Sequence, residues 1–191
     1  MTDLAERRGF ETEVYEPAAD SRLLAETAVA HLDAPRRVLD VGTGTGYVAA
    51  RVHEATGASV VGTDLNPHAC RRARENGVEA VRCDLLGAIA SGCVDAVTCN
   101  PPYLPTDPDA ERGDWLDLAL SGGRSGRAVI ERFLADVGRV LVPEGEVYLL
   151  VSSHTGVDAV LEAAGGHGFD ASAVDETAFP GETLSVLLLT R

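Results

Sequence analysis

The chain has 191 residues, of which 45% are hydrophobic, and it carries a formal net charge of −14. This length suits one domain, and the apolar content excludes a disordered protein. No apolar stretch approaches the ~20 residues that a membrane-spanning helix needs, and the first residues lack the apolar core of a secretory signal. We therefore expect a cytoplasmic protein.

All 16 basic residues are arginines, against 30 acidic residues. An acid excess without lysine is typical of a halophilic protein, because carboxylates keep the surface hydrated in concentrated salt. A coding bias toward arginine is the alternative, and it explains the missing lysines but not the acids. A surface this negative disfavours extensive nucleic-acid contacts, although high salt would screen the repulsion.

The four cysteines predict neither a metal centre nor a disulfide. None of them pairs with another cysteine or with a histidine at the spacing of zinc ligands, and disulfides are rare in cytosolic chains. We interpret them as ordinary thiols: Cys70, Cys83, Cys93 and Cys99.

Short apolar runs alternate with amphipathic stretches along the chain. The apolar runs predict strands at residues 37–41, 58–63, 78–82, 94–99, 146–152, 170–177 and 183–190. Helices are predicted at residues 47–56, from Asn66-Pro67 onward, and at 85–90, 127–141 and 156–164. Asn and Pro are favourable residues at a helix start. A polar loop at 104–121 is long enough to favour a substrate-facing or lid role.

This alternation predicts an α/β fold, with a parallel sheet covered by helices on both faces. Only residues 179–182 separate the last two predicted strands, and so short a connection joins antiparallel neighbours. We expect a seven-stranded, mostly parallel sheet whose last strand is antiparallel. Residues 1–191 then form a single domain, with a helical lead-in at 1–35 and the sheet at 36–191.

A glycine-rich turn, Asp40-Val41-Gly42-Thr43-Gly44-Thr45-Gly46, follows the first predicted strand. Glycines let the backbone approach a ligand closely, and the next helix offers free N–H groups at its start. Asp64 ends the second strand, where a carboxylate accepts hydrogen bonds from ribose hydroxyls, and Asp84 follows the third, where it can face an adenine amino group. Each acid taken singly is equally well interpreted as a helix cap. Together they indicate a cofactor that contains adenosine.

The same residues favour S-adenosylmethionine over a dinucleotide. Phosphate recognition needs the Gly-x-Gly-x-x-Gly spacing or a lysine, whereas here the third glycine comes too early and lysine is absent. Asp40 would repel a pyrophosphate but suits the sulfonium and ammonium groups of S-adenosylmethionine. NAD is the second candidate.

Asn100-Pro101-Pro102-Tyr103 follows the fourth predicted strand, at the edge where open α/β sheets bind ligands. The prolines fix the backbone, so that the Asn100 side-chain oxygen and the Pro101 carbonyl can accept both hydrogens of a planar NH2 group while Tyr103 stacks on it. The nitrogen electrons are then directed at a methyl carbon, and catalysis consists of positioning and electrostatics. A structural Asn-Pro turn is the alternative.

The glycine turn and the Asn-Pro-Pro-Tyr motif resemble those of the Rossmann-like, seven-stranded class I methyltransferases that act on amino groups. Residues 14–21 (VYEPAADS), 122–127 (GGRSGR) and 181–186 (GETLSV) narrow the resemblance to the HemK type, and within it to the short archaeal and eukaryotic branch. That branch methylates N5 of the glutamine in the Gly-Gly-Gln motif of class-1 peptide release factors. Bacterial relatives carry a separate N-terminal substrate domain, for which this chain is too short.

The resemblance implies roles for single residues. Cofactor contacts are implied for Ser21, Asp40, Gly42, Asp64, Asp84, Leu85 and Asn100, and the glycine turn itself predicts Thr43, Gly44 and Gly46. Asn100 also grips the substrate amide, together with Pro101 and Tyr103. Ala19 departs from the acid that many relatives carry. A small zinc-binding activator subunit is implied as a partner.

Two other functions stay open at this point. The two acceptors also suit an exocyclic amino group of a base in RNA or DNA, although the sequence has neither a basic stripe nor an added RNA-binding domain. The chain can also be a non-catalytic cofactor-binding subunit, against which Asn100 and Tyr103 argue. Trp115, the only tryptophan, either packs the 104–121 loop or contacts substrate.

Overall fold

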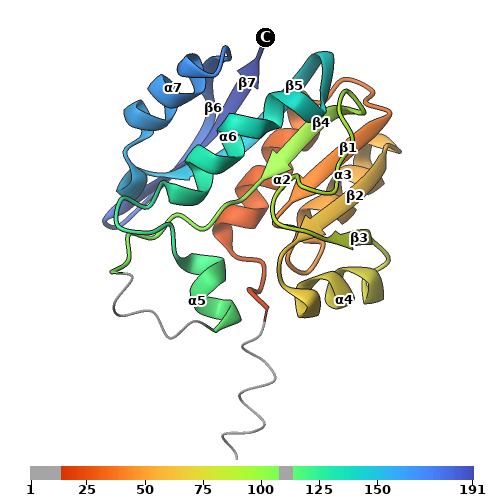
Figure 1. Ribbon diagram of the computed structural model, residues 1–191, viewed down its shortest axis with the longest axis horizontal. Coiled ribbons are helices and arrows are strands. Elements are labelled where there is room, and N and C mark those ends of the chain that lie inside the picture. The colour runs from red at the N-terminus through yellow and green to blue at the C-terminus, as the bar shows by residue number, and fades with distance from the viewer. Residues whose placement is uncertain (1–13, 108–113) are drawn as a thin grey trace, which may run out of the picture.

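The computed structural model describes residues 14–107 and 114–191. The first 13 residues of the predicted lead-in and residues 108–113 of the predicted loop lie outside this range. Figure 1 shows a twisted sheet with α6 and α7 in front of it and α2 and α3 behind it. The predicted arrangement of helices on both faces is therefore confirmed.

The sheet has seven strands in the order β3-β2-β1-β4-β5-β7-β6. The strands are β1 (Arg37–Val41), β2 (Ser59–Asp64), β3 (Glu79–Arg82), β4 (Val94–Cys99), β5 (Leu141–Ser152), β6 (Asp170–Phe179) and β7 (Glu182–Thr190). β1 to β5 pair in parallel, whereas β7 lies between β5 and β6 and runs antiparallel to both. The predicted antiparallel last strand is therefore confirmed.

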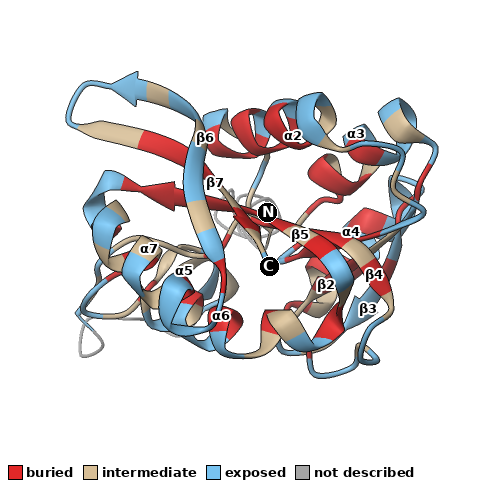
Figure 2. Cartoon of the chain, turned by 90° about the horizontal axis from the view of Figure 1, so that it is seen from above, coloured by how far each residue is buried: buried red, intermediate tan, exposed pale blue. Residues whose placement is uncertain are grey.

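The helices pack on the two faces of the sheet according to the alternation of side chains along each strand. They are α2 (Ala19–His31), α3 (Tyr47–Thr56), α4 (Pro67–Glu75), α5 (Trp115–Leu120), α6 (Ala128–Val140), the 3-10 helix η2 (Ser153–Thr155) and α7 (Val157–Gly166). Val38 packs with α2 and α3, and its neighbour Leu39 packs with α6 and α7. Cys70 of α4 packs against Ala49 of α3, which places α4 on the first face. Figure 2 shows the buried residues concentrated on the central strands, while β6 at the edge is largely exposed.

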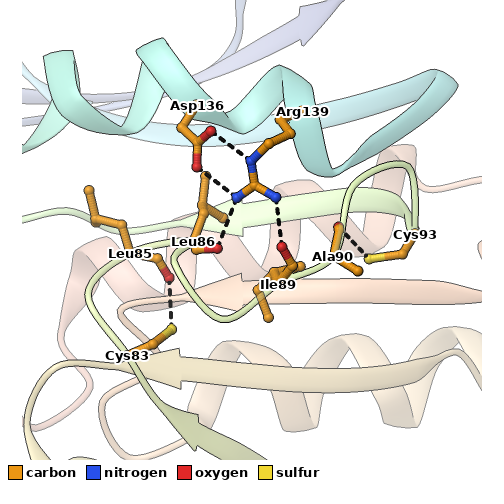
Figure 3. A network of polar contacts seen from close by, with 8 residues as sticks. All are labelled: Cys83, Leu85, Leu86, Ile89, Ala90, Cys93, Asp136 and Arg139. Atoms are coloured by element: carbon orange, nitrogen blue, oxygen red, sulfur yellow. Dashed lines mark hydrogen bonds and ion pairs between the residues drawn. The ribbon is translucent and has the colours of Figure 1, made fainter.

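The prediction of a short helix at residues 85–90 is wrong, because the structure has successive turns there. Arg139 of α6 fixes them by donating hydrogen bonds to the carbonyls of Ile89 (2.7 Å) and Leu86 (3.0 Å), as Figure 3 shows. Within the segment, the N–H groups of Gly87 and Ile89 donate to the carbonyls three residues earlier, which is the pattern of turns. The Leu86 side chain is buried, so the turns cover the sheet without a helix.

Two boundaries also differ from the prediction. β5 begins at Leu141 rather than at residue 146, because the Leu141 end pairs with Val94 and a bulge then absorbs the register shift. Pro143 and Gly145 made this stretch resemble a loop in the sequence. The predicted loop contains α5, which starts where the Asp114 carboxylate accepts a hydrogen bond from the N–H of Asp117 (2.8 Å). None of the described helices is long and apolar enough to cross a membrane.

Candidate active site

A cavity of about 440 Å³ opens at the carboxyl ends of β1, β2 and β4, where open parallel sheets bind ligands. Its volume lies in the range of small-molecule sites. The predicted site residues on its wall are Ser21, Asp40, Gly42, Thr43, Gly44, Asp64, Asp84, Leu85, Asn100, Pro101 and Tyr103. The structure therefore brings together residues that are spread over more than 80 positions of sequence.

The glycine turn is held against β2 by its own backbone. The N–H groups of Gly42 and Thr43 both donate to the carbonyl of Thr63, at 2.8 and 2.9 Å. Gly42 and Gly44 have φ of 71° and 55°, a region that favours glycine. The turn therefore presents main chain rather than side chains to the cavity.

Gly46 is the one predicted site residue that lies outside the described wall of this cavity. It has φ of 83° and caps the start of α3. A Cβ at this position would lie 3.0 Å from Cγ2 of Val78 and 3.2 Å from Cβ of Ala73. Gly46 is thus required for close packing between α3 and its neighbours.

Asp40 is buried beneath the turn, with 2% of its surface exposed. Its two carboxylate oxygens accept hydrogen bonds from the hydroxyls of Thr43 and Thr98, both at 2.7 Å. Burial raises the pKa of Asp40 to about 6, although the two threonine hydrogen bonds act in the opposite direction. At neutral pH it therefore supplies a negative charge behind the turn and rigidly fixes Thr43.

Asp64, at the end of β2, faces the cavity beside the turn. It accepts hydrogen bonds from the N–H of Gly44 (2.9 Å) and from the N–H of Asn66 (2.8 Å), one on each carboxylate oxygen. Burial raises its pKa above the usual range. Because a carboxylate has about four acceptor sites, both oxygens can still accept hydrogen bonds from a ligand.

Asp84 lies on the cavity wall, and its role of facing an adenine amino group stays a prediction. Its carboxylate forms an ion pair with Arg132 of α6 at 2.5 Å, and both residues lie on the cavity wall. Leu85 follows with φ of 48°, which turns the chain sharply at this point. Arg132 escaped the sequence analysis because nothing in the pattern of α6 distinguishes it from other exposed helix residues.

Asn100, Pro101 and Tyr103 also line the cavity, directly after β4 and beside the glycine turn. The two loops approach closely, since a Cβ on Gly42 would lie 3.6 Å from the Asn100 carbonyl oxygen. Within residues 14–107 and 114–191, the Asn100 side chain makes no hydrogen bond. Its amide is therefore available to a ligand in the cavity.

The segment before α2 and helix α5 complete the wall, and Figure 1 shows both at the same end of the sheet. Tyr15 and Asp20 come from the first, and Trp115 and Leu118 from the second. The sequence analysis assigned no role to Tyr15 or Asp20, although both belong to the segment that carries the family resemblance. Trp115 meets the ring of His68 edge-on, with centroids 6.5 Å apart, so it both packs α5 and lines the cavity.

The fold and the site together define a Rossmann-like methyltransferase. A family model described as "Methyltransferase domain" matches residues 38–123. A Methanocaldococcus jannaschii protein named as a protein N5-glutamine methyltransferase is 34% identical, covering 92% of this chain and 90% of its own. The human methyltransferase HEMK2 is 32% identical, covering 96% and 92%. The chain belongs to this HemK-type family of protein-glutamine methyltransferases.

Solved structures agree with this assignment. The Mtq2–Trm112 complex of E. cuniculi, described as responsible for the methylation of the translation termination factor eRF1, contains a chain with 32% identity and a TM-score of 0.78. The match covers 94% of this chain and 99% of that one. The T. thermophilus 16S rRNA methyltransferase RsmC, solved with AdoMet and guanosine, has 20% identity and a TM-score of 0.67 over 91% of this chain and 38% of its own, which shows a shared fold.

Proposed function

We propose that this protein transfers a methyl group from S-adenosylmethionine to the side-chain amide nitrogen (N5) of the glutamine in the Gly-Gly-Gln motif of a class-1 peptide release factor. The observation that carries the proposal is the placement of Asn100 and Pro101 on the same cavity wall as the glycine turn and its acids. The names of the relatives support it, because several are release factor glutamine methyltransferases.

The cavity suits S-adenosylmethionine by its charge and by its backbone. Asp40 supplies a buried negative charge that attracts a sulfonium or an ammonium and repels a pyrophosphate. Gly42 and Gly44 keep the turn free of side chains, and Asp64 retains acceptor capacity for ribose hydroxyls. Ser21, Thr43, Asp84 and Leu85 complete the proposed cofactor site. The cofactor, when bound, supplies an electrophilic methyl group.

Asn100 and Pro101 act on the substrate. The Asn100 side-chain oxygen and the Pro101 carbonyl accept the two hydrogens of the glutamine amide, and Tyr103 stacks on its plane. An amide nitrogen is a weak nucleophile because its electrons are delocalised, so holding both hydrogens would turn the lone pair toward the methyl carbon. The N–C bond would form as the S–C bond of the sulfonium breaks, and one of the two held protons would leave the nitrogen, so that the products are S-adenosylhomocysteine and the neutral methylamide. Acceptors held in fixed positions by the fold need no reorganisation during the reaction.

We also propose that the chain is one catalytic domain, 1–191, and that its lead-in at 1–35 is part of the site. In support, Tyr15, Asp20 and Ser21 line the cavity together with residues of the sheet at 36–191. Leu23 and Leu24 of α2 pack into the same apolar cluster as β5 and β7. The lead-in and the sheet therefore share a core.

A small activator subunit, zinc-binding as the resemblance implies, is proposed to bind at β3. This strand is at the edge of the sheet, so one side of its backbone can pair with another chain. Two large apolar side chains, Val81 and Leu65, are 40% and 45% exposed there. The E. cuniculi relative was solved as a complex with Trm112. Added subunit should raise both the solubility and the activity of the purified chain.

The test is methyl transfer from labelled S-adenosylmethionine in molar salt, a condition chosen for the acid excess of the chain. The acceptors are the release factor, the same factor with its glutamine changed to alanine, and total RNA, each with and without activator. Label on the factor that disappears with the glutamine supports the proposal. Label on RNA alone would show that RNA, and not the release factor, is the substrate. Asn100→Ala should lower transfer about 10²- to 10³-fold, while Glu162→Ala, a change on the exposed face of α7 outside the described wall of this cavity, should not.

A further inference from the structure

The Asp20 carboxylate is a buried charge at the methyl-transfer end of the cavity, and the proposed mechanism gives it no role. It is 3% exposed and lies in the first turn of α2, where the helix dipole favours an acid. One oxygen accepts from the N–H (2.6 Å) and the hydroxyl (3.2 Å) of Ser21. The other accepts from the hydroxyl of Tyr15 at 3.1 Å.

Asp20 and Tyr103 line the same cavity, although they are more than 80 residues apart in the sequence. Tyr103 packs against the apolar cluster that contains Leu23 and Leu24 of α2. Burial raises the pKa of Tyr103 above its usual range, and the charge of Asp20 and a hydrogen bond to it add to the effect. Burial and the same carboxylate raise the pKa of Tyr15 to about 12. Both phenols therefore stay protonated and act as donors to the carboxylate.

A second carboxylate acts electrostatically on both phenols. It belongs to Glu182, the first residue of β7, which accepts a hydrogen bond from the Ser152 hydroxyl at 2.6 Å. Two of the segments that carry the family resemblance, 14–21 and 181–186, thus meet the substrate motif at 100–103.

We propose that Asp20 is a positioning residue for methyl transfer, which holds the rings of Tyr15 and Tyr103 in place at the end of the cavity where the substrate amide enters. This inference rests on the proposed function. An ionised, buried carboxylate needs several donors to offset its desolvation, and the phenols supply them. In return the carboxylate, anchored at the start of a helix, fixes the Tyr103 ring that stacks on the amide. Asp20 acts through Tyr103, without touching the reacting atoms.

The test is a double-mutant cycle with Asp20→Asn and Tyr103→Phe, measured in turnover and in denaturant unfolding. Each single variant should lower kcat on the release factor about 10- to 100-fold, with KM for the factor and Kd for S-adenosylmethionine within about threefold of wild type. The double variant should be no slower than the slower single variant, because both changes remove one interaction. Glu26→Gln, the matched change on the exposed side of α2, should leave all four quantities unchanged.

Two results would overturn the inference. Independent effects of the two changes on kcat, so that the losses multiply in the double variant, would show that Asp20 does not act through Tyr103. Coupling in unfolding without coupling in kcat would assign Asp20 a purely structural role. The unfolding cycle needs no substrate, so it tests the contact even if the wild type fails to methylate the release factor. That failure would refute the proposed function instead. The same cycle with Tyr15→Phe in place of Tyr103→Phe measures how much of the effect of Asp20 on kcat acts through Tyr15.

Discussion

Asp40 couples the affinity for a cationic ligand to pH, because its carboxylate titrates near neutrality. Burial raises the pKa of Asp40 to about 6. On that value its ionised fraction falls from about nine-tenths at pH 7 to about one-tenth at pH 5. If only the ionised form attracts the sulfonium, Kd for S-adenosylmethionine should weaken about tenfold over this interval and be constant above pH 7.

The stability of the ligand-free protein should depend on pH in the opposite direction. An unperturbed aspartate has a pKa of about 3.9, so the folded state binds this proton about two units more tightly than the unfolded state. The Asp40 contribution to the free energy of unfolding therefore falls as pH rises from about 4 to about 6, by roughly 3 kcal/mol, and is then level. Ligand affinity rises through the same range in which this contribution falls.

Isothermal titration calorimetry between pH 5 and 7.5, at constant salt, measures the first effect. Asp40→Asn keeps the size of the side chain and removes its titration. This variant should bind more weakly than wild type at pH 7, and its Kd should lose the tenfold dependence. A wild-type Kd that is constant between pH 5 and 7, or an equal dependence in Asp40→Asn, would refute the reasoning.

Three further substitutions have outcomes that follow from single contacts. Asn100→Ala should lower kcat about 10²- to 10³-fold in the methyl-transfer assay. The melting temperature should be unchanged, because this side chain makes no hydrogen bond within the described residues; a lower melting temperature would contradict this. Thr63→Val should raise the free energy of unfolding by about 1–2 kcal/mol in urea, since the buried Thr63 hydroxyl has no partner among them; destabilisation would reveal a missed partner. Gly46→Ala should cost at least about 1 kcal/mol in the same experiment, because of its φ of 83° and the Cγ2 of Val78 at 3.0 Å; a neutral result would contradict the packing argument.

The strands could be predicted from the sequence because each is a short apolar run between polar turns. The helix at 47–56 and the start of α4 at Asn66 also followed from local patterns, and the structure has both. The antiparallel direction of the last strand followed from the length of one connection, 179–182. These features depend on residues that are close in sequence, so they can be recognised from one amino-acid sequence alone.

Features that depend on distant residues escaped the prediction. The segment 85–90 is apolar enough for a helix, but Arg139 donates hydrogen bonds to the carbonyls of Leu86 and Ile89, and the segment forms turns instead. Arg132 of α6 pairs with Asp84 from 48 residues away in the sequence. Asp20 lies beside Ser21 in the sequence, and its interaction with Tyr103 exists only in the fold. Side-chain partners across the sheet leave no periodic signal.

Mass spectrometry of the release factor after incubation with the protein and S-adenosylmethionine tests the central claim most directly. The account predicts one added methyl group, located by fragmentation on the side chain of the Gly-Gly-Gln glutamine. At the time when the wild type has fully modified the factor, it also predicts little added mass with Asn100→Ala and full modification with Glu162→Ala. A methyl group on another residue, or equal modification by Asn100→Ala, would contradict the account.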